Sequence, residues 1–142
     1  MNELSATVLL VDDFGPFRAI VSSLLGERPE LQILAEASDG IEAVQKCAQL
    51  QPDVILLDIG LPKLNGIDAA RQIREVSPQS KIIFLSQESC ADLVQEALSL
   101  GARGYVTKNR VRSELLRAIE VVLEGRQFVG AGLVDNSESS KE

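Results

Sequence analysis

Residues 53–66 read DVILLDIGLPKLNG. Four consecutive apolar residues, Val54 to Leu57, run into Asp58, and two glycines and a proline follow by residue 66. A continuously apolar run of this kind is typical of a strand that is covered on both faces, as in a parallel sheet. The acidic residue at its end is either a simple turn residue or a reactive group, and the rest of the chain must decide between the two.

Other apolar and β-branched runs alternate with segments of helical periodicity. The runs are TVLLV from Thr7, LQILAEA from Leu31, KIIFLS from Lys81 and ARGYVTK from Ala102. Between them, apolar residues recur at i, i+3, i+4 and i+7 from Phe17, from Cys90 and from Leu115. Five strand–helix units of this length predict a doubly wound α/β domain with right-handed crossovers between parallel strands.

Residues that favour helix ends support these units. Pro16 suits the first turn of a helix, Asp39 and Glu42 form a capping-box pattern, and Gly125 fits the position just after a helix. After Gly125 the chain becomes small, polar and rich in Gly and Ser, as linkers are. We therefore predict one domain over residues 1–126 and a linker or tail over residues 127–142.

Composition excludes several classes of function. The formal net charge of −7 argues against binding of a nucleic-acid backbone by this chain itself. No apolar run approaches the roughly 20 residues of a membrane helix, and the N-terminus lacks the basic start of a signal peptide, so we expect a cytoplasmic protein without membrane contact. With no His and no CxxC pair a zinc site is not expected, and Cys47 and Cys90 are predicted to be buried, reduced thiols.

Polar and charged residues follow the predicted strands. The first strand ends at Asp12 and Asp13, the third at Asp58, the fourth at Ser86 and the fifth at Lys108. Each of these residues alone could be a turn residue, a helix cap or a solvated side chain. In an open doubly wound sheet, however, the carboxyl ends of the strands border one crevice. The joint placement therefore predicts a site.

Three neighbouring carboxylates repel one another unless a cation lies among them, and oxygen ligands suit Mg²⁺. A carboxylate can also accept a phosphoryl group as a nucleophile. Such a transfer needs in-line positioning and neutralisation of charge on the phosphoryl oxygens, to which Lys108 would contribute a positive charge and Ser86 a hydrogen bond. The buried strand before Asp58 would then serve to hold a phosphate acceptor at the crevice.

The motifs VLLVDDFGPFR, DVILLDIGLPKLNGIDA, IIFLS and GARGYVTK occur in this order. Together they resemble the receiver domain of two-component response regulators over about residues 5–126. The residues within the motifs are most similar to those of the LuxR-type (NarL/FixJ) subfamily. The resemblance implies a flavodoxin-like or CheY-like fold, with a five-stranded parallel sheet of order 2-1-3-4-5 and five helices on its two faces. Members typically carry a C-terminal helix-turn-helix DNA-binding domain.

The resemblance also assigns roles around the phosphate acceptor. Asp58 would be the phosphoacceptor and also one of the Mg²⁺ ligands. Asp13 would bind Mg²⁺ directly, Asp12 directly or through water, and the backbone carbonyl of Gly60 would complete the protein ligands.

The resemblance further makes Ser86 the switch hydroxyl and Lys108 the contact to the phosphoryl oxygens. Tyr105 would be a switch aromatic that follows Ser86, although an aromatic that simply packs over the fifth strand is the alternative. Gln87 stands where the family usually has a small residue, which could change access to the phosphoryl group. Asn109 stands where many receivers have a cis-proline, and a trans peptide is expected here.

The function implied is that of a signalling protein rather than an enzyme. A sensor histidine kinase would donate the phosphoryl group, and phosphorylation would alter the face formed by the fourth helix, fifth strand and fifth helix, with a homodimer as one outcome. DNA would be bound only through a domain absent from this sequence. We expect the chain to be a segment of a longer regulator, with a stand-alone receiver as the alternative.

Three other functions compete with this interpretation. A pseudo-receiver that is controlled by contacts rather than by phosphate would keep the fold, and only Gln87 favours it. A phosphohydrolase with an Asp nucleophile typically has a DxD motif after the first strand, whereas Asp12 and Asp13 are adjacent. A flavin carrier is rejected because the loop DDFGPF is acidic and lacks the donors that a flavin phosphate needs.

Overall fold

The computed structural model describes residues 5–87 and 90–130, in which strands and helices alternate. The elements are β1 (Ala6–Val11), α1 (Gly15–Leu25), β2 (Leu31–Ala37), α2 (Gly40–Leu50), β3 (Val54–Asp58), α3 (Gly66–Val76), β4 (Lys81–Ser86), α4 (Ala91–Ser99), β5 (Gly104–Thr107), the 3₁₀ turn η1 (Lys108–Arg110), α5 (Val111–Leu123) and β6 (Phe128–Val129). No helix among the described residues is long and apolar enough to span a membrane.

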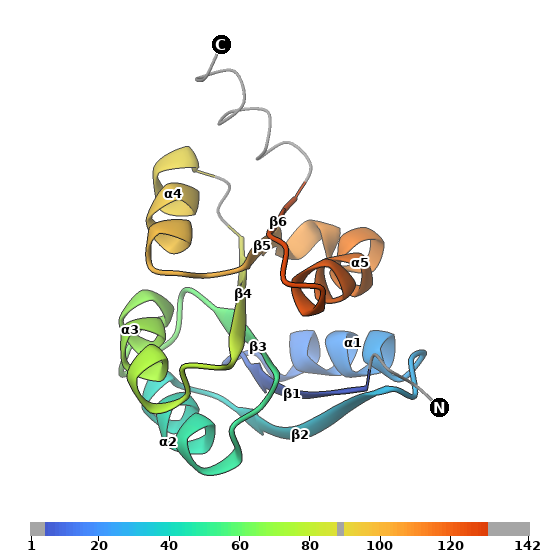
Figure 1. The fold of residues 1–142 in the computed structure, drawn as a ribbon, viewed down its shortest axis with the longest axis horizontal. Coiled ribbons are helices and arrows are strands. Elements are labelled where there is room, and N and C mark those ends of the chain that lie inside the picture. The colour runs from blue at the N-terminus through green and yellow to red at the C-terminus, as the bar shows by residue number, and fades with distance from the viewer. Residues whose placement is uncertain (1–4, 88–89, 131–142) are drawn as a thin grey trace.

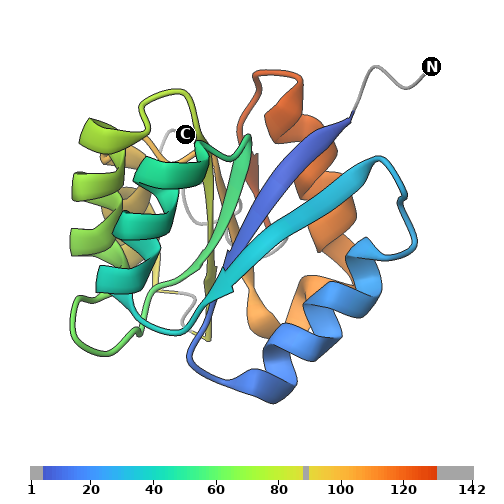
Figure 2. The same cartoon turned by 90° about the horizontal axis from the view of Figure 1, so that it is seen from below.

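The described strands form one parallel sheet in the order β2-β1-β3-β4-β5-β6. Figure 1 shows α2, α3 and α4 on one face of this sheet and α1 and α5 on the other. The view from below in Figure 2 shows the same two layers of helices with the sheet between them. The predicted doubly wound α/β fold and its strand order 2-1-3-4-5 are therefore confirmed.

The short strand β6 was not predicted. It pairs with β5, and the amides of Phe128 and Gly130 donate to the carbonyls of Arg103 and Tyr105 at 2.9 and 3.0 Å. Residues 127–130 belong to the stretch predicted to be a linker, yet they extend the sheet by one strand. Residues 131–142 lie outside the described residues, so the linker stays a prediction for them.

The central strands carry the core, as their apolar runs predict. The side chains of residues 8–11 in β1 and 54–57 in β3 are completely buried. Alternate residues face opposite layers: Leu56 packs in the cluster under α1 and α5, whereas Leu57 packs in the cluster under α2, α3 and α4. Both faces of the sheet are thus buried from solvent at these strands, which explains why the strands are apolar throughout.

The predicted helix ends also form. Pro16 lies in the first turn of α1, and Gly125 follows α5 with a left-handed φ of +87°. Asp39 is the N-cap of α2 and accepts from the Glu42 amide at 2.8 Å. The return bond differs from a standard capping box, because the Glu42 carboxylate accepts from the Ser38 amide at 2.9 Å.

The two cysteines differ, which corrects one prediction. Cys47 is buried in α2, and burial raises the pKa of its thiol to about 12. Cys90 is exposed because it is the N-cap of α4 rather than part of its apolar face, which begins deeper in the helix with Val94 and Ala97. The apolar period in the sequence thus begins one residue before the helix does.

This difference predicts unequal thiol reactivity. At about pH 8, a thiol with a pKa near 12 is thiolate in only about one molecule in 10⁴, so native Cys47 should resist a disulfide reagent while Cys90 reacts. Spectroscopic titration should count one reactive thiol per native chain and two in guanidinium chloride. In Cys90→Ser the native count should fall to zero. Equal rates for the two thiols in the native protein would contradict the assignment.

Gly66 allows α3 to begin against the end of β3. Its amide donates to the Ile59 carbonyl at 2.7 Å, and a Cβ on Gly66 would lie 2.3 Å from the Asp58 carbonyl oxygen. The neighbouring N-cap, Asn65, accepts from the Asp68 amide at 2.9 Å and fixes this start. Any side chain at position 66 must therefore push the backbone of Asp58 or the helix away.

Replacing Gly66 with Ala should destabilise the fold. A methyl group forced into backbone typically costs about 1–3 kcal/mol in the free energy of unfolding, which denaturant titration measures. Gly60→Ala is the matched control, because nothing lies within 4 Å of the added Cβ. Its stability should stay within about 0.5 kcal/mol of the wild type. Equal losses in the two variants would show that the close approach at Gly66 does not matter.

Candidate functional site

The register of the sheet brings the predicted site residues to one edge. The pairs at this edge are Val11 with Leu57, Asp58 with Leu85, and Ser86 with Thr107. Because the strands are parallel, Asp12, Asp58 and Ser86 lie side by side at their carboxyl ends. Lys108 comes next after β5, as the first residue of η1 rather than the last of the strand.

The alternation of side chains divides these residues between two sides. The residues two positions before Asp12, Asp58 and Lys108 all belong to the core cluster under α1 and α5. Ser86 lies two positions after Phe84, which packs in the cluster under α2, α3 and α4. The two carboxylates and the ammonium therefore share one side of the sheet edge, and the hydroxyl approaches from the other.

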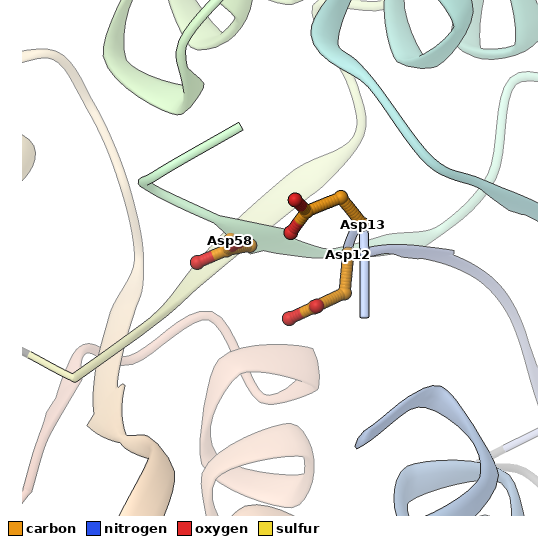
Figure 3. A group of neighbouring side chains, drawn as sticks. All are labelled: Asp12, Asp13 and Asp58. Carbon is orange, nitrogen blue, oxygen red and sulfur yellow. The ribbon is translucent and has the colours of Figure 1, made fainter. Parts of the chain in front are cut away.

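Three carboxylates meet at this edge, as Figure 3 shows, with Asp12 and Asp13 coming from the end of β1 and Asp58 from the end of β3. One oxygen of each lies within 4.8 Å of the others. Asp12 is completely buried and Asp58 is 6% exposed, whereas Asp13 is exposed. Water can therefore screen only one of the three charges well.

Lys108 supplies the ammonium group nearest to these charges. Its Nζ lies 2.6 Å from Asp12 Oδ2 and 3.4 Å from Asp58 Oδ1, and its side chain is only 15% exposed. The Phe17 ring covers the ammonium, with its centroid 4.6 Å from Nζ. Three carboxylates against one ammonium leave an excess of two negative charges.

The orientation of Asp12 is fixed by its neighbours. Its Oδ1 accepts from the Phe14 amide at 2.8 Å, and Arg18 Nη1 donates to its backbone carbonyl at 2.6 Å. Arg18 is itself held by Glu36, with Nε 2.8 Å from Oε1. Asp12 Oδ2 has the Lys108 ion pair but no partner with hydrogen-bond geometry among the described residues. A buried carboxylate oxygen left in this state is suited to bind a cation.

The electrostatics at Asp58 show the same shortage of positive charge. Burial raises the pKa of its carboxyl above the usual range, and the charge of Asp12 raises it further. Lys108 and the Gly60 amide, which donates to Oδ1 at 3.3 Å, act in the opposite direction but do not cancel the shift. A divalent cation bound among hard oxygen ligands would offset the excess, and Mg²⁺ is suited to such a set.

A cavity of about 1130 Å³ opens over this edge of the sheet. Ser86, Gln87 and Asn109 line it together with Asp13 and Asp58. The two residues that depart from the family pattern, Gln87 and Asn109, thus both border the space that a phosphoryl group would enter. No cis peptide occurs in the described part of the chain, so the expected trans bond before Asn109 is confirmed.

Tyr105 lies in the core beneath this edge. Its side chain is fully buried, and its ring centroid is 6.5 Å from that of Phe84 at an interplanar angle of 49°. This packing is the alternative considered for Tyr105, and a role as a switch that follows Ser86 remains a prediction.

Sequence reasoning missed two residues that shape the site. Phe17 was assigned only to the apolar stripe of its helix, and the same position lets its ring cover Lys108. Arg18 holds the Asp12 carbonyl because α1 starts close to the end of β1. Charge and periodicity alone do not signal such a contact, since it depends on the angle at which the helix leaves the sheet.

Comparison with known proteins identifies the family. Residues 8–120 match the model of the response regulator receiver domain. The chain is 33% identical over 136 residues to the transcriptional regulatory protein DegU of Brevibacillus brevis, covering 96% of this chain and 58% of DegU. It is also 33% identical over 132 residues to the nitrate/nitrite response regulator protein NarL of Escherichia coli K12, covering 93% of this chain and 61% of NarL.

A solved structure agrees with these matches. The crystal structure of a LuxR-family two-component response regulator from Aurantimonas sp. SI85-9A1 superposes with a TM-score of 0.91 at 32% identity, covering 97% of this chain and 99% of that one. The chain spans about 60% of the length of DegU and of NarL. By its sequence match and its structure, this chain belongs to the response regulator receiver domain family, with homologues among the NarL and DegU LuxR-type regulators.

Proposed function

We propose that the chain is a phosphorylatable receiver that takes a phosphoryl group from the phosphohistidine of a sensor histidine kinase onto Asp58. The observation that carries this proposal is the charge balance at the sheet edge. Three carboxylates have oxygens within 4.8 Å of one another, with one ammonium among them. Such an arrangement costs free energy in the folded protein unless it binds a cation, so its presence favours a metal-assisted function.

In this reaction an Asp58 carboxylate oxygen attacks phosphorus in line with the leaving imidazole. An O–P bond forms as the P–N bond breaks, and the imidazole nitrogen keeps the electron pair and takes a proton. β3 holds Asp58 rigidly for this attack, because the residues before it are fully buried. Burial and the charge of Asp12 raise the pKa of the Asp58 carboxyl, and a cation held by the neighbouring carboxylates would lower it and so favour the nucleophilic carboxylate.

Asp12, Asp13 and the backbone carbonyl of Gly60 would hold Mg²⁺ beside Asp58. When bound, the ion supplies charge neutralisation at the phosphoryl oxygens. Lys108 is already directed at Asp58 by Asp12 and Phe17, so it can contact a phosphoryl oxygen with little reorganisation. Ser86, at the adjacent strand end, would donate a hydrogen bond to another oxygen.

The phosphoryl group would act as a signal through Ser86 and Tyr105. Movement of the Ser86 hydroxyl toward the phosphoryl group would change the packing that Tyr105 can adopt, and with it the surface of α4, β5 and α5. Homodimerisation is one consequence that such a surface could have. The names of the relatives, a transcriptional regulatory protein and a nitrate/nitrite response regulator, favour control of transcription as the output.

Direct phosphorylation tests the proposal. Incubation with acetyl phosphate and Mg²⁺ should add about 80 Da to the intact mass, one phosphoryl group. The adduct should be absent from Asp58→Asn and from wild type in EDTA. Asp68→Asn, in the first turn of α3 with its side chain half exposed, is a matched control and should be labelled as the wild type is. If the wild type gains no mass under excess donor and metal, the chain is a pseudo-receiver controlled by contacts.

The charge balance also predicts how metal affects stability. In EDTA, the free energy of unfolding of Asp58→Asn should exceed that of the wild type by more than about 0.5 kcal/mol, because the variant removes one of the buried like charges. Denaturant titration measures this difference. Mg²⁺ at 100 times its Kd should stabilise the wild type by about 2.7 kcal/mol and the variant by much less. A variant less stable than the wild type in EDTA would show that Asp58 is not under electrostatic strain.

A further inference from the structure

A second pocket lies at the opposite edge of the sheet from the aspartates. It has a volume of about 420 Å³, and its positively charged lining residues are Arg74, Lys81 and Arg103. Lys81 begins β4, Arg103 immediately precedes β5, and Arg74 lies in the last turn of α3. This basic pocket, defined by these three residues, is therefore at the amino ends of the strands, where the proposed phosphorylation chemistry does not take place.

Among residues 5–87 and 90–130, the three cations of the basic pocket have no ion-pair partner. In the part of the chain that the structure describes, only four lysines and arginines lack an acidic group within 4.0 Å, and the fourth is Arg112. Acidic residues outnumber basic ones by seven over the whole chain, so unpaired cations are not a consequence of scarce carboxylates. Three of the four line the same small pocket.

Capping of helix ends accounts for part of this charge. Arg74 Nη1 donates to the Leu100 carbonyl at 2.7 Å, and Arg103 Nη1 donates to the Gly125 carbonyl at 3.2 Å. The carboxyl ends of α3, α4 and α5 each act as about −0.5 elementary charge, or about −1.5 together. The three cations carry a charge of +3, so after the helix ends are counted the pocket keeps a positive charge of about 1.5. Capping alone therefore does not neutralise it.

The same bonds hold the arginines in place for a ligand. Arg74 lies over Gly101, where an added Cβ would clash with its guanidinium, so the side chain occupies a position that only glycine leaves open. Each guanidinium uses one of its five N–H donors on a helix carbonyl and keeps the others. The two guanidinium groups and the Lys81 ammonium together offer more donors and more positive charge than a single carboxylate can use. They therefore favour a ligand with phosphate oxygens.

We propose that the basic pocket binds a small molecule that carries two linked phosphate groups. Gln79, Ser80 and Gln127 add uncharged polar groups to the wall, and a volume of 420 Å³ is larger than one phosphate needs and lies within the range of small-molecule sites, about 300–1000 Å³. The site is independent of the proposed phosphorylation, because it shares no residue with the aspartate edge.

Titration with inorganic pyrophosphate, followed by ¹⁵N–¹H NMR, tests this site. The buffer contains EDTA and no Mg²⁺, so that the aspartate edge stays negative and repels the anion. Amide shifts should saturate with one site per chain and map to residues 79–82, 101–103 and 127. Lys81→Gln and Arg103→Gln should each weaken binding about tenfold.

Arg71→Gln is the matched control, since it removes the same charge one turn before Arg74 on α3 at a residue already paired with Asp68. Its Kd should change less than twofold. Lys81 has no ion pair among the described residues, so Lys81→Gln tests the charge even if Arg103→Gln perturbs the fold. The proposal is overturned if the shifts do not saturate at millimolar pyrophosphate, if they map to the aspartate edge, or if Arg71→Gln weakens binding as much as Lys81→Gln.

Discussion

Crowding of like charges at the carboxyl edge of the sheet is the constraint on which the site depends. Parallel pairing sets Asp12 beside Asp58, and the buried runs before them prevent either from moving away. Two of the three carboxylates are shielded from water, and Lys108 compensates only one charge. The free energy that this arrangement costs must be supplied by the hydrophobic core, which covers both faces of the sheet. In the proposed function, a bound cation would offset this cost.

The same core gives the two sides of the site different neighbours. Asp12, Asp58 and Lys108 share the side of α1 and α5, where Phe17 and Arg18 fix the lysine and the loop after β1. Ser86 belongs to the opposite side, above Phe84 and Tyr105. In the proposed function, chemistry and response would therefore use different faces of one sheet, and the alternation of side chains along the strands would link them.

Much of this could be predicted from the sequence because two strong patterns agree. Continuously apolar strands alternating with amphipathic helices define a doubly wound sheet, and polar residues at the strand ends then meet at one edge by the rule for such sheets. Asp12, Asp13, Asp58 and Ser86 all follow from these two steps, and Lys108 is displaced only from the strand end into the next turn.

The features that sequence did not predict depend on weaker or three-dimensional signals. β6 has only two residues, too few to show a periodic pattern, and it forms because the amides of Phe128 and Gly130 donate to the carbonyls of Arg103 and Tyr105. Cys90 continues an apolar stripe but precedes the first helical turn, which leaves it exposed. The basic pocket collects residues from three separate elements whose proximity only the fold creates.

Binding of Mg²⁺ in the absence of any phosphate donor tests the charge-crowding mechanism most directly. An NMR titration of the wild type with MgCl₂ should give saturable amide shifts centred on residues 12–14 and 58–60, and Asp13→Asn should weaken the apparent affinity at least tenfold. Small shifts spread over the surface without saturation, or an affinity unchanged in Asp13→Asn, would contradict the claim that the three carboxylates are held together for a cation.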